Sequence, residues 1–252
     1  MGDADSDVSS SGRLTLPVQM LLAFIAGAAY PLAFAPFHLW PLTFASAAVL
    51  FWLMSRAEGR MPLIAWVFGL GKYAVGVSWI YVSIHQYGGA SPLLAGIMVA
   101  VFVAFMALFC LPIGWFLGKL EASKQNISKS VLAMGFVATW VLMEWMLTWF
   151  LTGFPWLFAG HAMLGTPLQG YAPIVGNLGI SLVVLTITVA VMLSVDQAQP
   201  WKMRLAMAGV AVVLAGLGVS LDRQVWTKPT GRYEAALCLL YTSPSPRDFV
   251  RS

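Results

Sequence analysis

The sequence predicts an all-α polytopic membrane protein with about seven transmembrane helices. Of its 252 residues, 60% are hydrophobic and only 10% are charged. Soluble domains hold roughly 25% charged residues, so the composition excludes a soluble enzyme. The aromatic fraction of 13% excludes a disordered chain, and the two cysteines exclude a disulfide scaffold. The alternation of apolar and polar residues that a transmembrane barrel requires is absent.

The predicted helices follow one another with short connections. Their apolar windows are residues 17–35, 39–54, 62–82, 92–117, 130–151, 173–195 and 203–221. A helix needs about 20 apolar residues to cross the hydrocarbon core. The second window is shorter, so we expect that helix to be little tilted or flanked by interfacial turns. Together the windows define a membrane domain over residues 17–221, preceded by a tail at 1–16.

The basic residues lie in alternate connections and predict the orientation. They are Arg13 before the first window, Arg56 and Arg60 after the second, Lys119, Lys124 and Lys129 after the fourth, and Lys202 and Arg204 after the sixth. The connections 36–38, 83–91 and 152–172 contain no lysine or arginine. Because cytoplasmic loops carry the basic excess, the N-terminus is predicted to be cytoplasmic and the chain after about residue 221 to lie outside.

The first window has a second interpretation as a signal peptide, because the small residues at 26–29 could form a cleavage region. The apolar stretch continues to Phe34, and the segment before it contains Asp3, Asp5 and Asp7. Both features favour a transmembrane helix. Cleavage would leave the topology of the remaining helices unchanged.

The uncharged connections hold most of the candidate site. Aromatic anchoring at the membrane interface explains a single tryptophan or tyrosine there. A rigid Gly-Phe-Pro-Trp turn followed by a loop of about twenty uncharged residues favours a functional role. The predicted substrate-binding residues in these connections and at the end of the window 62–82 are Trp79, Tyr81, His85, Phe154, Pro155 and Trp156.

Glu144 is the seventh predicted substrate-binding residue. It follows Lys129 by fifteen residues, or roughly 22 Å of helix, which places it in the outer third of the bilayer. A carboxylate there costs about 2.5–3.5 kcal/mol unless it is paired or hydrated. A hydrogen bond to a neighbouring helix and a substrate contact explain it equally well. Lys72 is expected near mid-membrane, at a different depth, so we expect no direct pair with Glu144.

The remaining motifs predict packing rather than chemistry. His38, His85 and His161 match no metal-ligand spacing and are interpreted as interfacial residues, so no metal site is predicted. Cys110 is expected to be a small packing residue. Close helix packing is the interpretation of the glycines at 69, 71 and 76 and of the glycine pair at 114 and 118. Nothing in the sequence predicts a cofactor or a nucleic-acid partner.

Several stretches together are specific to one family. They are Leu32-Ala33-Phe34-Ala35-Pro36-Phe37 with Trp40-Pro41, Gly76 through Ile84, Glu144 through Leu157 with its Thr-Gly-Phe-Pro-Trp run, and Pro167 through Ile174 with Gly176. In order and spacing they resemble apolipoprotein N-acyltransferase, the last enzyme of bacterial lipoprotein maturation. Leu147-Thr148 stands where the family often has Arg-Gly, which leaves in doubt a polar contact made there.

The resemblance implies a two-part enzyme of the bacterial inner membrane. Seven helices precede a nitrilase-like domain on the periplasmic face, and an eighth follows it. A cysteine nucleophile in that domain, supported by glutamate and lysine, takes an acyl chain from a phospholipid as a thioester. The chain then passes to the α-amino group of a diacylglyceryl-cysteine on the apolipoprotein acceptor. The membrane helices would position both lipids.

The C-terminal residues lead to a further expectation. Residues 222–237 resemble a linker and the start of the nitrilase-like domain, whereas 238–252 resemble a translated sequencing adapter and are set aside. Cys238 is therefore not interpreted as the nucleophile, and the chain as given is expected to lack the catalytic domain and to be inactive.

Two other functions stay open on the residues alone. A small transporter or channel would place polar residues along several helices or show an inverted repeat. A helical scaffold that only recruits a soluble partner would need no catalytic domain at all.

Overall fold

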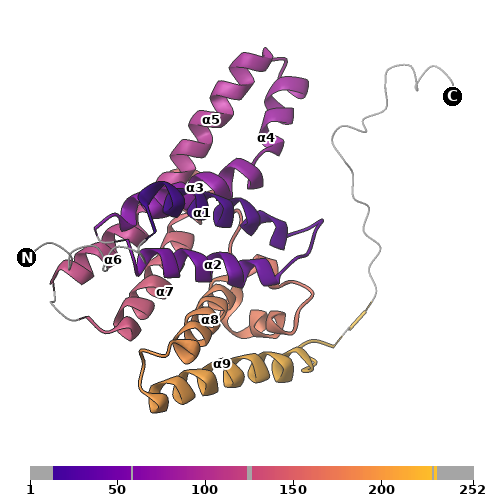
Figure 1. Cartoon of the computed structure of the whole chain (residues 1–252). Coiled ribbons are helices and arrows are strands. Elements are labelled where there is room, and N and C mark those ends of the chain that lie inside the picture. The colour runs from indigo at the N-terminus through magenta and orange to yellow at the C-terminus, as the bar shows by residue number, and fades with distance from the viewer. Residues whose placement is uncertain (1–13, 58, 124–126, 229, 232–252) are drawn as a thin grey trace, which may run out of the picture.

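The computed structural model describes residues 14–57, 59–123, 127–228 and 230–231. Within these ranges the regular structure is entirely helical, and no strand occurs (Figure 1). The all-α fold class is therefore confirmed. The segment predicted to come from an adapter, 238–252, lies outside the described residues, as do residues 1–13 of the predicted tail and residues 232–237 of the predicted linker.

Nine α-helices are connected by short turns within the described residues. They are α1 (Leu16–Ala29), α2 (Pro41–Met54), α3 (Met61–Gly76), α4 (Trp79–Val82), α5 (Pro92–Leu108), α6 (Leu111–Ser123), α7 (Lys129–Met146), α8 (Ala172–Val195) and α9 (Trp201–Asp222). The turns are η1 (Tyr30–Ala33), η2 (Ser83–Tyr87), η3 (Phe150–Thr152), η4 (His161–Met163) and η5 (Pro167–Tyr171).

Local sequence accounts for where several helices begin. Proline stands in the first turn of α1, α2, α3, α5 and α8. Its fixed φ suits a helix start, where its missing N–H costs nothing. Ser91 caps α5 and Ser128 caps α7, each hydroxyl accepting a hydrogen bond from a backbone N–H at 3.3 Å.

Four helical stretches are long and apolar enough to cross a membrane. They are Leu16–Ala33, Pro92–Ser123, Pro167–Val195 and Trp201–Asp222. The pair Met61–Gly76 and Trp79–Tyr87, bent by 50°, makes a fifth if it counts as one span. The chain is thus a multi-pass membrane protein, as predicted. The number seven and the side of the membrane that each end faces stay predictions.

The structure agrees with one of the predicted windows and changes the bounds of two others. Helix α2 has only 14 residues, in agreement with the short second window. A turn at residues 109–110 divides the fourth window into α5 and α6. The fifth window was predicted to reach residue 151, but α7 ends at Met146. The chain then turns with positive φ at Leu151 and Thr152, so the end of this window is not helical.

Helices α1 and α3 cross at very short range, and glycines at the crossing permit it. A Cβ atom added to Gly27 would overlap the carbonyl oxygen of Phe68, and one added to Gly71 would overlap that of Phe24. Small residues let helix backbones approach closely in membranes. Of the predicted glycine pair on α6, only Gly114 lies against another helix, at Met61, whereas Gly118 faces open space. The pair is therefore not a two-residue packing motif.

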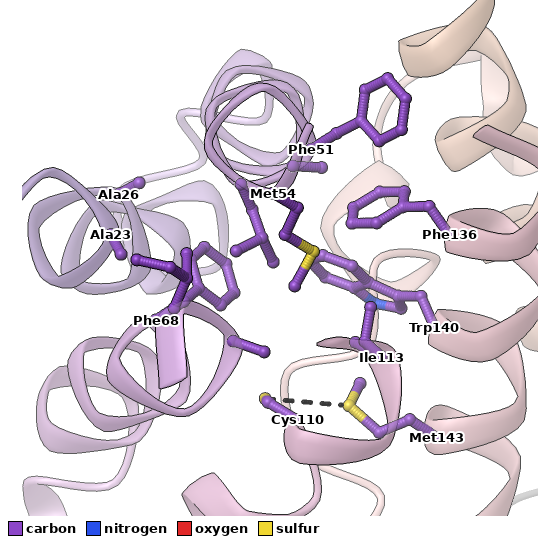
Figure 2. Packing of buried hydrophobic residues seen from close by; sticks show 14 of the residues in the cluster. Ala23, Ala26, Phe51, Met54, Phe68, Cys110, Ile113, Phe136, Trp140 and Met143 are labelled. Carbon is purple, nitrogen blue, oxygen red and sulfur yellow. Dashed lines mark hydrogen bonds between the residues drawn. The ribbon is translucent and has the colours of Figure 1, made fainter. Parts of the chain in front are cut away.

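The core lies between α1, α2, α3 and α7 and is rich in aromatic rings. Figure 2 shows the rings of Phe51, Phe68, Phe136 and Trp140 pointing into this space. Trp140 is almost completely buried, and its ring centroid lies 5.8 Å from that of Phe68 and 5.5 Å from that of Phe136 in edge-to-face geometry. Such pairs add about 0.5–1.5 kcal/mol to the burial of the rings.

Helices α7, α8 and α9 are joined by polar contacts at both ends. At one end Lys129 Nζ lies 2.6 Å from Asp196 Oδ2, linking the start of α7 to the segment after α8. At the other end Gln169 Nε2 donates to Asp222 Oδ1 at 3.0 Å. The Tyr171 hydroxyl, also in η5, donates to the carbonyl oxygen of Leu214 at 2.8 Å. Helices α8 and α9 lie side by side in Figure 1, and η5 holds the end of α9.

Candidate functional site

A cavity of about 470 Å³ lies where three loop segments meet. Its walls come from residues within 31–38, after α1, within 75–79, at the end of α3, and within 155–164, after α7. We call it the loop cavity. Among the described residues that line it, only two histidines and two tryptophans carry polar side-chain atoms, and the rest are apolar. Its volume lies in the range of about 300–1,000 Å³ that is usual for ligand sites.

The turn after α7 brings the third segment to the cavity. Leu151 and Thr152 have φ of 49° and 74°, and Gly153 has φ of 84°. A Cβ atom at Gly153 would overlap the carbonyl oxygen of Thr148, so only glycine fits there. Non-glycine residues in the left-handed region cost of the order of 1–3 kcal/mol and gather at functional sites. The strained turn therefore favours a functional role for this loop.

Trp156 fixes the loop to the end of α3. Its Nε1 donates to the carbonyl oxygen of Gly76 at 3.2 Å. Its ring lies 5.7 Å from the ring of Trp79 and 6.0 Å from that of Phe154. A Cβ atom at Gly76 would overlap the end of the Leu157 side chain, so a larger residue there would require Leu157 to move. The two chain segments with the predicted aromatic residues thus meet at one wall of the cavity.

The structure divides the predicted site residues into two groups. Trp79, Pro155 and Trp156 line the loop cavity. Phe154 does not line it and instead packs edge-to-face on Phe102 of α5, with the centroids 5.5 Å apart. A substrate contact for Phe154 stays a prediction.

Tyr81 and His85 also lie away from the loop cavity, in α4 and η2. Their rings are 5.5 Å apart, and His85 Nδ1 lies 2.8 Å from the carbonyl oxygen of Ala90. In Figure 1 their segment runs beside α5, where both project from the other helices. A substrate contact for these two residues likewise stays a prediction.

Glu144 is fully buried and does not line the cavity. Its Oε1 accepts hydrogen bonds from Trp140 Nε1 at 3.0 Å and from the backbone N–H of Ala159 at 2.8 Å. The hydrogen-bonding explanation of this carboxylate therefore has direct support, although one donor lies on its own helix and the other in a loop, and neither on a neighbouring helix. Lys72 is fully buried as well, and its Nζ has no hydrogen-bond partner among the described residues. The two side chains make no direct pair, as expected.

Two histidines that the sequence favoured as interfacial residues line the loop cavity. They are His38 and His161, the second stacked on Phe158 with ring centroids 5.5 Å apart. Burial lowers the pKa of His161, so its ring is neutral near pH 7. In the part of the chain that the structure describes, no three His, Cys, Asp or Glu side chains are grouped to hold a metal ion. The two histidines thus offer hydrogen-bonding groups to a ligand, and that of His161 is neutral.

Cys110, the one cysteine within the described ranges, is not part of this site. Its thiol is buried at the break between α5 and α6 and lies 3.9 Å from Met143 Sδ (Figure 2). This position agrees with the predicted packing role.

Comparisons with known proteins assign the chain to a family. A sequence model described as the apolipoprotein N-acyltransferase N-terminal domain matches residues 26–192, a range that contains every residue lining the loop cavity. Apolipoprotein N-acyltransferase of Pseudomonas syringae pv. tomato is 40% identical over 214 residues, and that of Pseudomonas putida is 41% identical over 213. Each alignment covers 84% of this chain and 42% of the relative. The enzyme of Coxiella burnetii is 38% identical over 220 residues, which are 83% of this chain and 43% of the relative.

The chain therefore spans about two fifths of the length of these relatives, and the sequence model that it matches describes an N-terminal domain. Helices α2 to α7, the loop cavity and the Thr-Gly-Phe-Pro-Trp turn all lie within the residues that this model matches. We conclude that the chain belongs to the family of apolipoprotein N-acyltransferase N-terminal domains.

Proposed function

We propose that this chain is the membrane part of a lipoprotein N-acyltransferase and that its loop cavity holds an acyl chain of the phospholipid donor. The observation that carries the proposal is the cavity itself. It is apolar, has the volume of a ligand site, and is lined only by residues within the family match. The partners would be a phospholipid, as acyl donor, and the lipidated N-terminus of an apolipoprotein, as acceptor.

The contribution of the cavity would be positioning rather than binding energy. An acyl chain that enters from the bilayer leaves surroundings as apolar as the cavity wall, so the hydrophobic effect gives little net gain. Shape and a few polar groups must then hold the lipid. The Trp79 and Trp156 rings give a rigid wall, and the imidazoles of His38 and His161 are the polar groups beside it. Fixing the ester near a nucleophile is the kind of orientation that lowers reaction barriers.

The chemistry would follow the two steps that the family resemblance implies. A cysteine thiolate attacks the ester carbonyl of the phospholipid, the C–O bond breaks, and lysophospholipid leaves with a proton while a thioester remains. The α-amino group of the acceptor cysteine then attacks the thioester, forming an amide and returning the thiol. Cys110 is unsuited to the first step because its thiol is buried in the helical core. The nucleophile would lie in the nitrilase-like part of the enzyme.

Purified chain 1–252 is accordingly expected to form no acyl thioester when it is incubated with phospholipid vesicles. Hydroxylamine-sensitive labelling from a radiolabelled acyl donor would measure this, with a full-length relative as the positive control. Labelled Cys110 would contradict the expectation, because it would show that a buried thiol within the membrane domain is reactive.

A photoreactive phospholipid tests whether the loop cavity holds lipid. We expect a diazirine near the end of an acyl chain to label residues 31–38 and 155–164 of the chain in nanodiscs. Val75→Trp should strongly reduce this labelling, because Val75 lines the cavity and a larger ring would fill part of it. Val101→Trp is the matched control, since this valine is also exposed but lies on α5, outside the cavity. Equal labelling in the two variants would exclude the cavity as a lipid site.

A further inference from the structure

Two opposite charges lie inside the helical bundle. Lys72 on α3 and Glu144 on α7 are both completely buried, and no other charged side chain among the described residues is buried. An isolated charge in an apolar interior carries a large desolvation penalty, which an opposite charge nearby offsets in part. The mechanism proposed above uses neither residue, and neither one lines the loop cavity.

One indole ring lies between the two charges. Lys72 Nζ lies over the face of Trp140, 5.6 Å from the ring centroid, while Nε1 at the edge of the same ring donates to Glu144 Oε1. The face of an aromatic ring is negative and its edge is positive. Trp140 therefore presents the favourable part of its charge distribution to each partner.

The lysine is further surrounded by aromatic faces. Its Nζ lies 4.8 Å from the ring centroid of Tyr30 and 5.4 Å from that of Tyr73. Desolvated cation–π contacts of this kind stabilise an ammonium group. This cage, together with the carboxylate beyond the indole, offsets part of the cost of burying the Lys72 ammonium without a hydrogen-bond acceptor.

Both charges are connected to the wall of the loop cavity. Glu144 Oε1 accepts from the backbone N–H of Ala159, in the loop segment 157–160 that follows Trp156. The next residue, Gly160, donates its N–H to Ser181 Oγ of α8 at 2.8 Å. On the other side, Lys72 precedes Gly76 by one helical turn, and the carbonyl oxygen of Gly76 accepts from Trp156.

We propose that Lys72 and Glu144 form a charge-compensated pair across the Trp140 indole and that this pair positions the loop segment 157–160 beneath the cavity. Glu144 is then a positioning residue: its carboxylate holds the Ala159 N–H, and the ammonium of Lys72 allows the carboxylate to stay charged. The effect on lipid rests on the proposed function, whereas the pair and its hold on the loop do not.

A double-mutant cycle tests the pairing on the whole chain in detergent. Lys72→Met leaves a buried carboxylate, Glu144→Gln leaves a buried ammonium, and the double variant leaves neither charge. We expect each single variant to lower Tm and the double variant to recover part of the loss. Lys202→Met, at an exposed lysine of α9, is the control for removing a positive charge and should leave Tm unchanged. Losses that simply add in the double variant would overturn the pair.

A second measurement distinguishes positioning from general stability. The amides of Ala159 and Gly160 should exchange hydrogen faster in each single variant than in the wild type, at a temperature where all variants remain folded. Glu144→Gln keeps an acceptor oxygen, so faster exchange there reports the lost charge rather than a lost hydrogen bond. Unchanged exchange in both single variants would contradict the positioning role. If a single variant cannot be purified, recovery of the double variant still supports the pair, and failure of the double variant counts against it.

The photoreactive phospholipid separates this inference from the proposed function. If the wild type labels the loop cavity, each single variant should label it less. If the wild type does not label the cavity, the proposed lipid site fails, while Tm and exchange still decide the pair.

Discussion

Gly27→Ala is expected to destabilise the folded protein by about 1–3 kcal/mol, although it adds a single methyl group. The added Cβ would overlap the carbonyl oxygen of Phe68, which belongs to the backbone of α3 and cannot rotate away. The two helices would have to separate along the crossing, and the aromatic core behind them would loosen. Unfolding in mixed detergent micelles, followed by helical circular dichroism, would measure the loss.

Gly216→Ala is the matched control, because this glycine lies in α9 with nothing within 4 Å of the added Cβ. Alanine has the better helix propensity, so this variant should be neutral or slightly stabilising. Gly71→Ala is expected to behave like Gly27→Ala, since its Cβ would overlap the carbonyl oxygen of Phe24. Equal stabilities for the variants at 27 and 216 would show that α1 and α3 are not held by this close crossing.

Trp156→Ala is expected to lower kcat/KM about 10- to 100-fold in a full-length acyltransferase that carries this membrane part. The change removes one wall of the loop cavity, the ring contact with Trp79 and the hydrogen bond to Gly76. A misplacement of about 1 Å can cost a factor of this size when catalysis depends on orientation. Acyl transfer from phospholipid to a diacylglyceryl peptide would be the assay.

Trp156→Phe separates the ring from the hydrogen bond, because it keeps an aromatic wall but loses the donor to Gly76. Its activity should lie between those of the wild type and Trp156→Ala. Trp201→Ala controls for the loss of an exposed tryptophan at the start of α9, outside the cavity. Wild-type kinetics for Trp156→Ala would reduce Trp156 to an interfacial anchor.

The fold class could be predicted from composition alone because a bilayer permits few solutions. A chain with 60% hydrophobic residues must satisfy its backbone polar groups internally, and helices do so within one segment. The positions of most helices followed from the apolar windows. The break at residues 109–110 was missed because the apolar run continues across it, although Pro112, in the first turn of α6, is a local signal for a new helix.

That Glu144 needs a hydrogen-bond donor was predictable, but the loop segment that provides one was not. Counting residues along the helix predicts a carboxylate inside the bilayer, and the structure shows that it is fully buried. One donor, Trp140 Nε1, lies one turn earlier on the same helix. The other is the Ala159 N–H, fifteen residues further on, in a loop that folds back after left-handed residues at Leu151 and Thr152. Leucine and threonine rarely adopt positive φ, so nothing in their identity predicts the turn.

The crossing of α1 and α3 shows the same limit. Gly71 was interpreted as part of a packed helix face, whereas Gly27 belonged to a run of small residues that resembled a cleavage region. The packing role of each glycine depends on the helix that lies against it. A single sequence does not show which faces of α1 and α3 meet. His38 and His161 were separated in the same way and meet only at the loop cavity.

The hydrogen bonds between α9 and η5 fix the position from which the chain continues toward any following domain. With Asp222 held by Gln169, the next nine residues extend the chain by at most about 30 Å. A short tether of this kind keeps its two ends at millimolar local concentration. A catalytic group attached after residue 231 would thus stay within a small volume around the loop cavity and would not need to reach it by free diffusion.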